Sequence, residues 1–220
     1  MLDKFAALEA ELEKALEAEL NARRRQREHY RELLLTLPAS IVRRVPLGEI
    51  ATIGTGSRNT NEAVPGGAYP FFVRSQEALC MDGYEYDEVA VITAGDGVGV
   101  GKIFHFVEGK YALHQRAYRI HPTSPAVNPR FLFHFIRNDF SRYLATISVH
   151  ASVTSLRKPM FEKYPVPVPP LDHQVHIVEV LDKFDALVND LSVGLPAELL
   201  ARRRQYEHYR DRLLTFPEAS

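Results

Sequence analysis

The sequence predicts an α+β protein in which a globular domain lies between two long helical segments. The first observation is an internal repeat: residues 2–38 match residues 181–217 without a gap, and 24 of 37 aligned pairs are identical. The second is the spacing of the copies. Repeats of a solenoid follow one another at a short period, whereas these flank 142 residues of unrelated composition. We therefore expect helical regions at 1–44 and 172–220 around a domain at 45–171.

The first helical region carries an apolar stripe with steps of three and four residues, and helix-forming residues make up nearly all of it. This pattern predicts one straight helix from Leu2 to Leu37, ending at Pro38. A helix of about 36 residues is roughly 54 Å long. The stripe consists of Phe5, Leu8, Leu12 and Leu16.

The second helical region follows Pro169-Pro170, where prolines precede a helix start and Asp172 can cap it. Its stripe consists of Val180, Phe184, Leu187 and Leu191. The segment Gly194-Leu195-Pro196 is expected to kink or break this helix, because proline removes a backbone donor and clashes one turn back.

Helices of this length cannot bury their stripes along a small domain, so each needs another helix. Matching stripes at opposite ends of one chain suit an antiparallel coiled coil. A run of three arginines is usually a solvated face, but its presence in both copies, beside a tyrosine, favours a surface for a partner that meets both helices. These residues are Arg23, Arg24, Arg25 and Tyr30 in the first copy and Arg202, Arg203, Arg204 and Tyr209 in the second.

The segment between the repeats has the pattern of strands and short helices. Three runs rich in β-branched and aromatic residues, separated by glycine-rich or polar turns, are typical of strands. They are Val89–Ile92, Lys102–Phe106 and Ala117–Ile120. Two helices are expected next, one opening at Asn128-Pro129 and running through Ile136, the other from Phe140 to Ile147.

Composition indicates a cytoplasmic protein that does not enter a membrane. The single cysteine, Cys80, cannot form an internal disulfide, and the acidic, amphipathic N-terminus does not resemble a signal peptide. No stretch approaches the ~20 apolar residues of a membrane span.

Charge is unevenly distributed, although the net charge is only −1. Residues 116–163 sum to +6, whereas residues 45–115 sum to −5. This distribution predicts one face that meets phosphates and another that repels them.

Catalytic motifs are largely missing from the sequence. The glycine-rich run 95–101 fits neither GxGxxG nor a Walker motif, and it predicts a flexible turn because glycine allows positive φ. Asp96 with Glu108-Gly109-Lys110 resembles, at a stretch, the acidic and lysine set of a magnesium nuclease, but Glu-Gly-Lys between strands favours a hairpin turn. Without HExxH or paired cysteines a zinc site lacks support, and there is no Asn-Pro-Pro-Tyr or Asp-Pro-Pro-Tyr segment. We expect a binding protein with no cofactor and no metal.

Six segments carry a family resemblance that covers essentially the whole chain. They are VPLGEIATIGTG, YPFFVRSQ, AVITAGDGVGVGKIF, HQRAYRI, SLRKPMFEKYPVPVPPL and the closing LDKFDALVNDLSVGLPAELLARRRQYEHYRDRLLTF. With them, the chain resembles a specificity subunit of a type I restriction-modification system. Members of that family normally carry two target-recognition domains and two conserved helical regions. This chain has one recognition domain with a conserved region on each side, so it resembles half of a full subunit.

The resemblance implies a non-catalytic subunit that binds double-stranded DNA and reads one half of an interrupted target. The helices then act as a spacer and as a dock for methyltransferase (M) and restriction (R) subunits. Turns that follow strands offer side chains suited to base edges, and a later basic segment offers phosphate contacts that fix register. The expected base-reading residues are Arg58, Asn59, Arg74, Ser75, Gln76, His114, Gln115 and Arg116. The expected phosphate-contacting residues are Thr154, Ser155, Arg157 and Lys158.

Two other functions are left open by the residues alone. One is a DNA endonuclease or another DNA enzyme acting by itself, and the other is a helical assembly adaptor whose domain reads no bases. Because one recognition domain covers one half-site, we expect two copies to pair through the arms and to read an interrupted palindrome. In the competing arrangement the two arms of one chain pack antiparallel on each other.

Overall fold

The computed structural model describes residues 2–38, 40, 42–147 and 155–189, and then residues 197, 201, 204–205, 207–209 and 211–212. The chain divides into two compact units, one made of Met1–Leu33 with Glu179–Ser220 and the other of Leu34–Val178. Among the described residues, no helix has the length and apolar character needed to cross a membrane.

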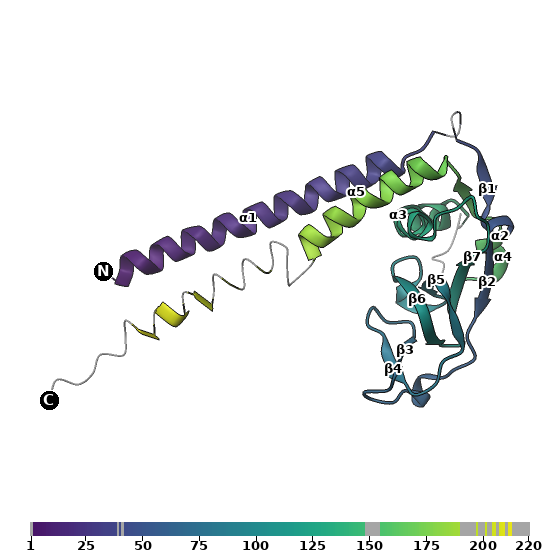
Figure 1. Cartoon of the computed structure of the whole chain (residues 1–220), viewed down its shortest axis with the longest axis horizontal. Coiled ribbons are helices and arrows are strands. Elements are labelled where there is room, and N and C mark those ends of the chain that lie inside the picture. The colour runs from purple at the N-terminus through teal and green to yellow at the C-terminus, as the bar shows by residue number, and fades with distance from the viewer. Residues whose placement is uncertain are drawn as a thin grey trace. The chain divides into compact units, whose positions relative to one another are not determined.

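The globular unit is built on a mixed sheet of six strands in the order β2-β7-β5-β6-β3-β4 (Figure 1). Neighbouring strands are antiparallel, except that β3 runs parallel to β6. The strands are β2 (Ala51–Thr55), β3 (Tyr69–Phe72), β4 (Leu79–Met81), β5 (Tyr86–Ala94), β6 (Phe104–Leu113) and β7 (Ala117–Pro122). Sheet and helices together confirm the predicted α+β class. Two of the three strands expected from sequence lie within β5 and β7, and the third, Lys102–Phe106, overlaps the start of β6 at Phe104.

The hairpin turn expected at Glu108-Gly109-Lys110 is wrong, because these residues lie inside β6. Val89 pairs with Glu108, and the ladder continues one residue for one residue to Tyr86 and Tyr111. Gly109 accommodates a φ of +97° within the strand, so glycine here serves a strand and not a turn. Ala94, the end of β5, is five residues from Val89, or about 17 Å. The sheet therefore keeps Asp96 apart from Glu108, and the nuclease-like set does not assemble.

One continuous helix, α3 (Pro129–Ile147), replaces the two helices expected from sequence. Its apolar positions continue without a glycine or proline break, so Ile136, Phe140 and Leu144 all face the core. α3 packs against β5 and β6. Phe140 also stacks on Phe161 at 5.0 Å between ring centroids, which ties α4 (Lys158–Glu162) to the same core.

The chain enters and leaves the globular unit at neighbouring strands. β1 (Arg44–Pro46) pairs antiparallel with β8 (Pro165–Pro167) in a separate two-stranded sheet. The short α2 (Leu47–Ile50) follows β1 directly, and 3₁₀ turns η1 (Thr60–Glu62) and η2 (Gly97–Gly99) lie in the loops after β2 and β5. η2 confirms that the glycine-rich run is a turn between strands, with positive φ at Gly97 and Gly101.

The other unit contains most of α1 (Leu2–Leu35) and the second half of α5 (Leu171–Asn189). Tyr30 stacks on Phe184 at 5.2 Å, and Arg27 pairs with Asp185 at 3.1 Å. The two helices run in opposite directions (Figure 1). This packing within one chain is the competing arrangement of the arms, and a coiled coil and a dimer remain predictions.

Several expected arm features differ from the structure or lie outside it. α1 ends at Leu35, two residues early, and Asp172 lies in the first turn of α5 instead of capping it. A carboxylate there still favours the helix through its dipole. Val180 is half-buried, Leu187 is 38% exposed and Arg204 is exposed. The stripe side chains of α1 at positions 5, 8, 12 and 16, together with Leu191, Arg202, Arg203 and the predicted kink at 194–196, lie outside what is described.

Gly56 marks a close approach between β2 and the end of β6. A Cβ at this position would lie 1.8 Å from the Leu113 carbonyl oxygen, whereas one at Gly83 would meet nothing within 4 Å. The two strand ends therefore touch only because residue 56 has no side chain, although β2 and β6 are not neighbours in the sheet.

We predict that Gly56→Ala lowers the free energy of unfolding by about 2 kcal/mol or more, as overpacking does, and the Tm by roughly 4–8 °C. Gly83→Ala is the matched control and is expected to leave the Tm unchanged. Thermal unfolding followed by circular dichroism measures both. Equal melting temperatures for the two variants would show that the strand ends do not depend on this contact.

Candidate nucleic-acid interface

Four turns meet at the start of β7, and we call residues 56–59, 74–76, 95–97 and 114–116 the turn cluster. β2 and β5 both run antiparallel to β7, so both end beside its first residues. β6 reaches the same place through the turn 114–116, and β3 ends there because it runs parallel to β6. The topology thus gathers all eight expected base-reading residues.

Main-chain hydrogen bonds join the turns. The Arg58 N–H donates to the Leu113 carbonyl at 3.2 Å, and the Gln115 N–H donates to the Arg58 carbonyl at 2.9 Å. The His114 N–H donates to Phe72 and the Gly95 N–H to Arg116, at 2.9 and 2.8 Å. The positions of the side chains are therefore set by backbone contacts between strands far apart in sequence.

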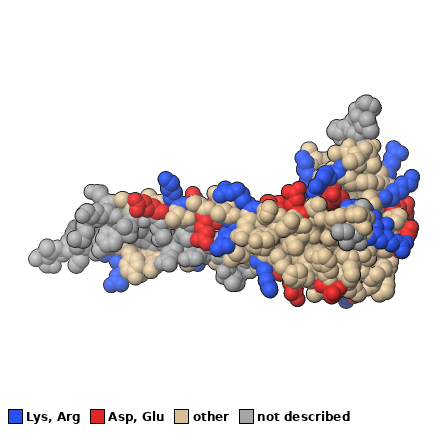
Figure 2. All heavy atoms as spheres, turned by 90° about the horizontal axis from the view of Figure 1, so that it is seen from above, with Lys and Arg blue, Asp and Glu red and all other residues tan. Residues whose placement is uncertain are grey.

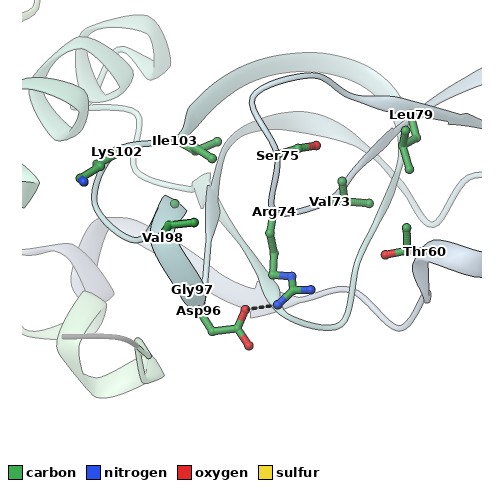
Figure 3. Close-up of a pocket in the computed structure, with 11 residues that line it drawn as sticks. Thr60, Val73, Arg74, Ser75, Leu79, Asp96, Gly97, Val98, Lys102 and Ile103 are labelled. Atoms are coloured by element: carbon green, nitrogen blue, oxygen red, sulfur yellow. Dashed lines mark hydrogen bonds and ion pairs between the residues drawn. The ribbon is translucent and has the colours of Figure 1, made fainter. Parts of the chain in front are cut away.

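The carboxylate of Asp96 binds two arginines of the turn cluster, one on each of its oxygens. Asp96 accepts a hydrogen bond from Arg74 on Oδ1 at 2.7 Å and one from Arg116 on Oδ2 at 3.2 Å. The bond from Arg74, with the charges of both arginines, holds the pKa of Asp96 below its usual range. Arg74 and Asp96 also line an open cavity of about 780 Å³, together with Val98 and Ile103 (Figure 3).

A third arginine is held in the same way. Arg58 pairs with Glu62 at 3.1 Å and approaches Glu85 to 4.0 Å. The Asn59 N–H donates to Glu62 at 2.6 Å, and this bond, followed by that from Arg58, lowers the pKa of the Glu62 carboxyl. Sequence reasoning missed Glu62 and Glu85 and weighed Asp96 only as a nuclease ligand, because no local motif reveals which cation a carboxylate faces.

Two amide side chains and a serine complete the turn cluster. Gln115 donates through Nε2 to Asn59 Oδ1 at 2.5 Å, and both residues are exposed. Ser75 donates its hydroxyl proton to the Glu77 carbonyl at 2.7 Å, and Gln76 is exposed. Donors and acceptors of several kinds therefore lie side by side at one edge.

His114 lies beneath this edge and is 5% exposed. Its Nδ1 accepts a hydrogen bond from the Arg116 N–H at 3.0 Å, which requires that nitrogen to be unprotonated. Burial, and then the charges of Arg74 and Arg116, lower the pKa of His114. The neutral ring thus supports the backbone of the 114–116 turn.

The basic segment expected to contact phosphates lies next to the turn cluster. Ser155 forms a bridge with Asp96, and the Leu156 N–H donates to the Gly95 carbonyl at 2.7 Å. Arg157 and Lys158 follow and are exposed, with Lys158 at 3.6 Å from Glu162. Thr154 lies outside the described residues.

The charge blocks of the sequence do not form separate faces, which corrects that expectation. β7 pairs with β5, so Arg119 of the basic block contacts Glu88 of the acidic block at 2.8 Å, as Arg116 contacts Asp96. Figure 2 shows basic and acidic side chains next to one another on the visible face of the globular unit. Within the described ranges, no three His, Cys, Asp or Glu side chains are grouped so that they could hold a metal ion.

The comparison with protein families agrees with the resemblance of the sequence. The model of the type I restriction modification DNA specificity domain matches residues 42–201, which is more than half of the chain. The chain therefore belongs to the type I restriction-modification specificity family. The matching family model is that of a DNA specificity domain and not of a catalytic domain. This confirms the expectation of a non-catalytic subunit.

Two curated relatives illustrate the relationship. The chain is 32% identical over 239 residues to the specificity subunit of the Escherichia coli type I restriction enzyme EcoR124I/EcoR124II, covering 99% of this chain and 58% of that subunit. It is 28% identical over 204 residues to a putative type I specificity subunit of Haemophilus influenzae, covering 83% and 48%. The chain thus spans about half the length of the relatives it matches.

Solved structures share the fold. The type I S subunit of M. genitalium superposes with a TM-score of 0.70 at 14% identity, over 97% of this chain and 59% of that one. The HsdS subunit of Thermoanaerobacter tengcongensis gives 0.57 at 15% identity, over 96% and 57%. At these identities the likeness shows the fold alone.

We predict that stability falls as the pH drops from 7 to 5, with His114 contributing. A histidine whose pKa is lowered on folding favours the folded state fully above about pH 6.5, and this contribution is lost as the pH falls toward the lower, folded value. His114→Asn places an oxygen where Nδ1 accepts its bond and removes the titration, so the variant should lose less stability over this range. Urea unfolding at each pH measures it. His173→Asn, an exposed position of α5, is the control, and a His114→Asn profile parallel to wild type would refute the assignment.

Proposed function

We propose that this chain is the DNA-recognition component of a type I restriction-modification complex and that the turn cluster reads bases of one half-site. One observation supports this proposal most strongly. The eight residues expected to read bases come from three distant segments, and they converge where several strands of the sheet end. Family membership supports the same function independently. The chain supplies recognition, and the chemistry of methylation and cleavage belongs to partner subunits.

The chemistry of the turn cluster supports direct readout. Arginine binds the O6 and N7 acceptors of guanine in bidentate fashion, and asparagine or glutamine binds the N6 and N7 of adenine. The cluster holds three arginines and the amide pair Asn59–Gln115 within one hydrogen-bonded edge. Such a set suits the major groove, where every base pair has its own pattern of donors and acceptors.

Arg157 and Lys158 are proposed to contact phosphates. They follow Ser155 and Leu156, which are bonded to the 95–97 turn, so they flank the readers without belonging to them. Contacts to phosphate fix the register of a protein on the duplex and carry no sequence information.

The two other functions find less support. A DNA enzyme acting alone would need a catalytic set, and the nearest such set, Asp96 with Glu108 and Lys110, is spread along the sheet. An adaptor without base readout would have no use for an edge with this many polar side chains held in place. Cleavage or methylation by the purified chain would support the first, and a selection without any preferred sequence would support the second.

The arms are proposed to act as spacer, coiled coil and dock for M and R subunits. The Tyr30–Phe184 stack supports antiparallel pairing of the helices. Arg24 and Arg25 are exposed on α1, and Tyr209, the repeat equivalent of Tyr30, is 53% exposed. These side chains are available to a partner that meets both copies of the repeat.

Two changes separate the proposed positioning and reading residues. The double change Arg157→Ala with Lys158→Ala is expected to weaken binding to all duplexes alike and to lower the slope of log K against log salt by about 0.9 per lost phosphate contact. Gln76→Ala or Arg116→Ala is expected to relax the preference at one base position. Selection from a randomised duplex pool, with the M subunit of the same system present, followed by salt titration, measures both. If the two sets of variants behaved alike, the division would be wrong.

Pairing of two copies is proposed because the chain carries one recognition domain, which covers one half-site. A closed two-fold pair presents the same surface twice. Its target is then an interrupted palindrome, with identical half-sites inverted about a spacer whose length the arms set.

We predict a mass of twice 25.0 kDa by light scattering and inverted half-sites in the selected DNA. Tyr209→Ala, in the exposed part of the arm, is expected to weaken pairing, and Tyr84→Ala, an exposed tyrosine of the globular unit, is the control. A single 25 kDa species at tens of micromolar, with one unrepeated half-site in the selected DNA, would contradict the dimer.

A further inference from the structure

A carboxylate at the centre of a surface that approaches DNA is unfavourable unless it has another task. Asp96 is 23% exposed at its side chain and lies among the proposed base readers. Its negative charge repels phosphates and offsets part of the attraction of the arginines beside it. Any role of Asp96 in DNA recognition must therefore outweigh its electrostatic repulsion of phosphates.

The geometry of Asp96 indicates such a role. Each of its oxygens binds a different arginine, Arg74 from the end of β3 and Arg116 from the turn before β7. Figure 3 shows the Arg74 side chain extending to the Asp96 carboxylate along the edge of the cavity. Both arginines keep exposed area, 43% and 62% of their side chains, so each retains donors that face solvent.

The backbone of Asp96 is itself held on two sides. The Gly95 N–H donates to the Arg116 carbonyl, and the Leu156 N–H donates to the Gly95 carbonyl, while Asp96 forms a bridge with Ser155. The carboxylate thus belongs to a fixed part of the turn cluster, whereas an arginine on an unsupported turn would lose rotamer entropy on meeting a base.

We propose that Asp96 is a positioning residue for specificity, which holds Arg74 and Arg116 in the orientation that reads base edges and keeps both from binding phosphates of any sequence. This inference rests on the proposed function, since it assigns a task within the reading surface. Asp96 acts through the two arginines and not through a contact of its own with a base. Its removal is expected to lower discrimination while leaving or raising non-specific affinity.

The test compares Asp96→Asn with Asp82→Asn in the full chain. Asp82 is an exposed carboxylate after β4, so its change alters the net charge equally. Binding is measured to the duplex selected by wild type, to that duplex with each base pair changed in turn, and to a scrambled duplex. We expect Asp96→Asn to reduce discrimination about fivefold or more at one or two base positions, the lower range for an arginine–base pair, with scrambled-duplex affinity equal or higher. Asp82→Asn is expected to keep the wild-type preference.

A double-mutant cycle tests whether Asp96 acts through the two arginines. In a chain that already carries Arg74→Ala and Arg116→Ala, Asp96→Asn is expected to change no base preference further. Thermal unfolding verifies that each variant folds, and Asp96→Glu, which keeps the charge, is expected to restore part of the preference if the asparagine variant is unstable.

The outcomes distinguish this inference from the proposed function. If wild type selects no sequence, the proposed function fails. If wild type selects a sequence and Asp96→Asn keeps the full preference, or loses affinity for all duplexes alike, the positioning role of Asp96 is overturned while base reading by the chain stands.

Discussion

The pairing of β7 with both β2 and β5 is the constraint on which the candidate interface depends. Because both neighbours run antiparallel to β7, their C-terminal ends lie beside its first residues, and the turn from β6 arrives at the same point. Parallel pairing of β3 with β6 brings in the last turn. The sheet coils enough that Arg58, beyond one edge strand, forms a bridge with His114, and Gly56 permits this approach because it lacks a side chain.

This arrangement reconciles a chain of net charge −1 with the DNA-reading surface proposed for it. A basic patch attracts every phosphate and so raises affinity for all sequences alike. In the turn cluster each of three arginines faces a carboxylate, and the local excess of positive charge is small. The carboxylates fix the orientation of the arginine side chains, because an arginine already bonded on one side offers its other donors in a restricted geometry. On the proposed function, such a surface favours discrimination between sequences over affinity for all of them.

Local sequence patterns predicted the helical arms and the positions of three strands, whereas long-range strand pairing decided which turns come together. Turns after β2, β3 and β6 were predictable because glycine and polar residues follow apolar runs. Their convergence was not, because it depends on β3 finding β6 some 40 residues later. The competition between local sequence pattern and long-range packing also explains the two wrong predictions. Glycine is a residue type typical of turns, yet the antiparallel pairing of β6 with β5 keeps Gly109 within a strand. The sequence predicts a break between helices at residues 137–139, yet the apolar positions continue across them in phase, so α3 is continuous.

The arms follow from a second pairing, that of β1 with β8, which places the entry and exit of the globular unit side by side. Fully buried Gln174 secures the exit, because it bonds the Asn128 N–H and the Ala126 and Pro169 carbonyls. The part of the second copy that the structure describes as continuous helix, residues 181–189 of α5, runs antiparallel to α1. In the sequence repeat, Tyr209 corresponds to Tyr30 and Phe5 corresponds to Phe184. The proposed pairing of two copies therefore involves residues of the arms, separate from those proposed to read DNA.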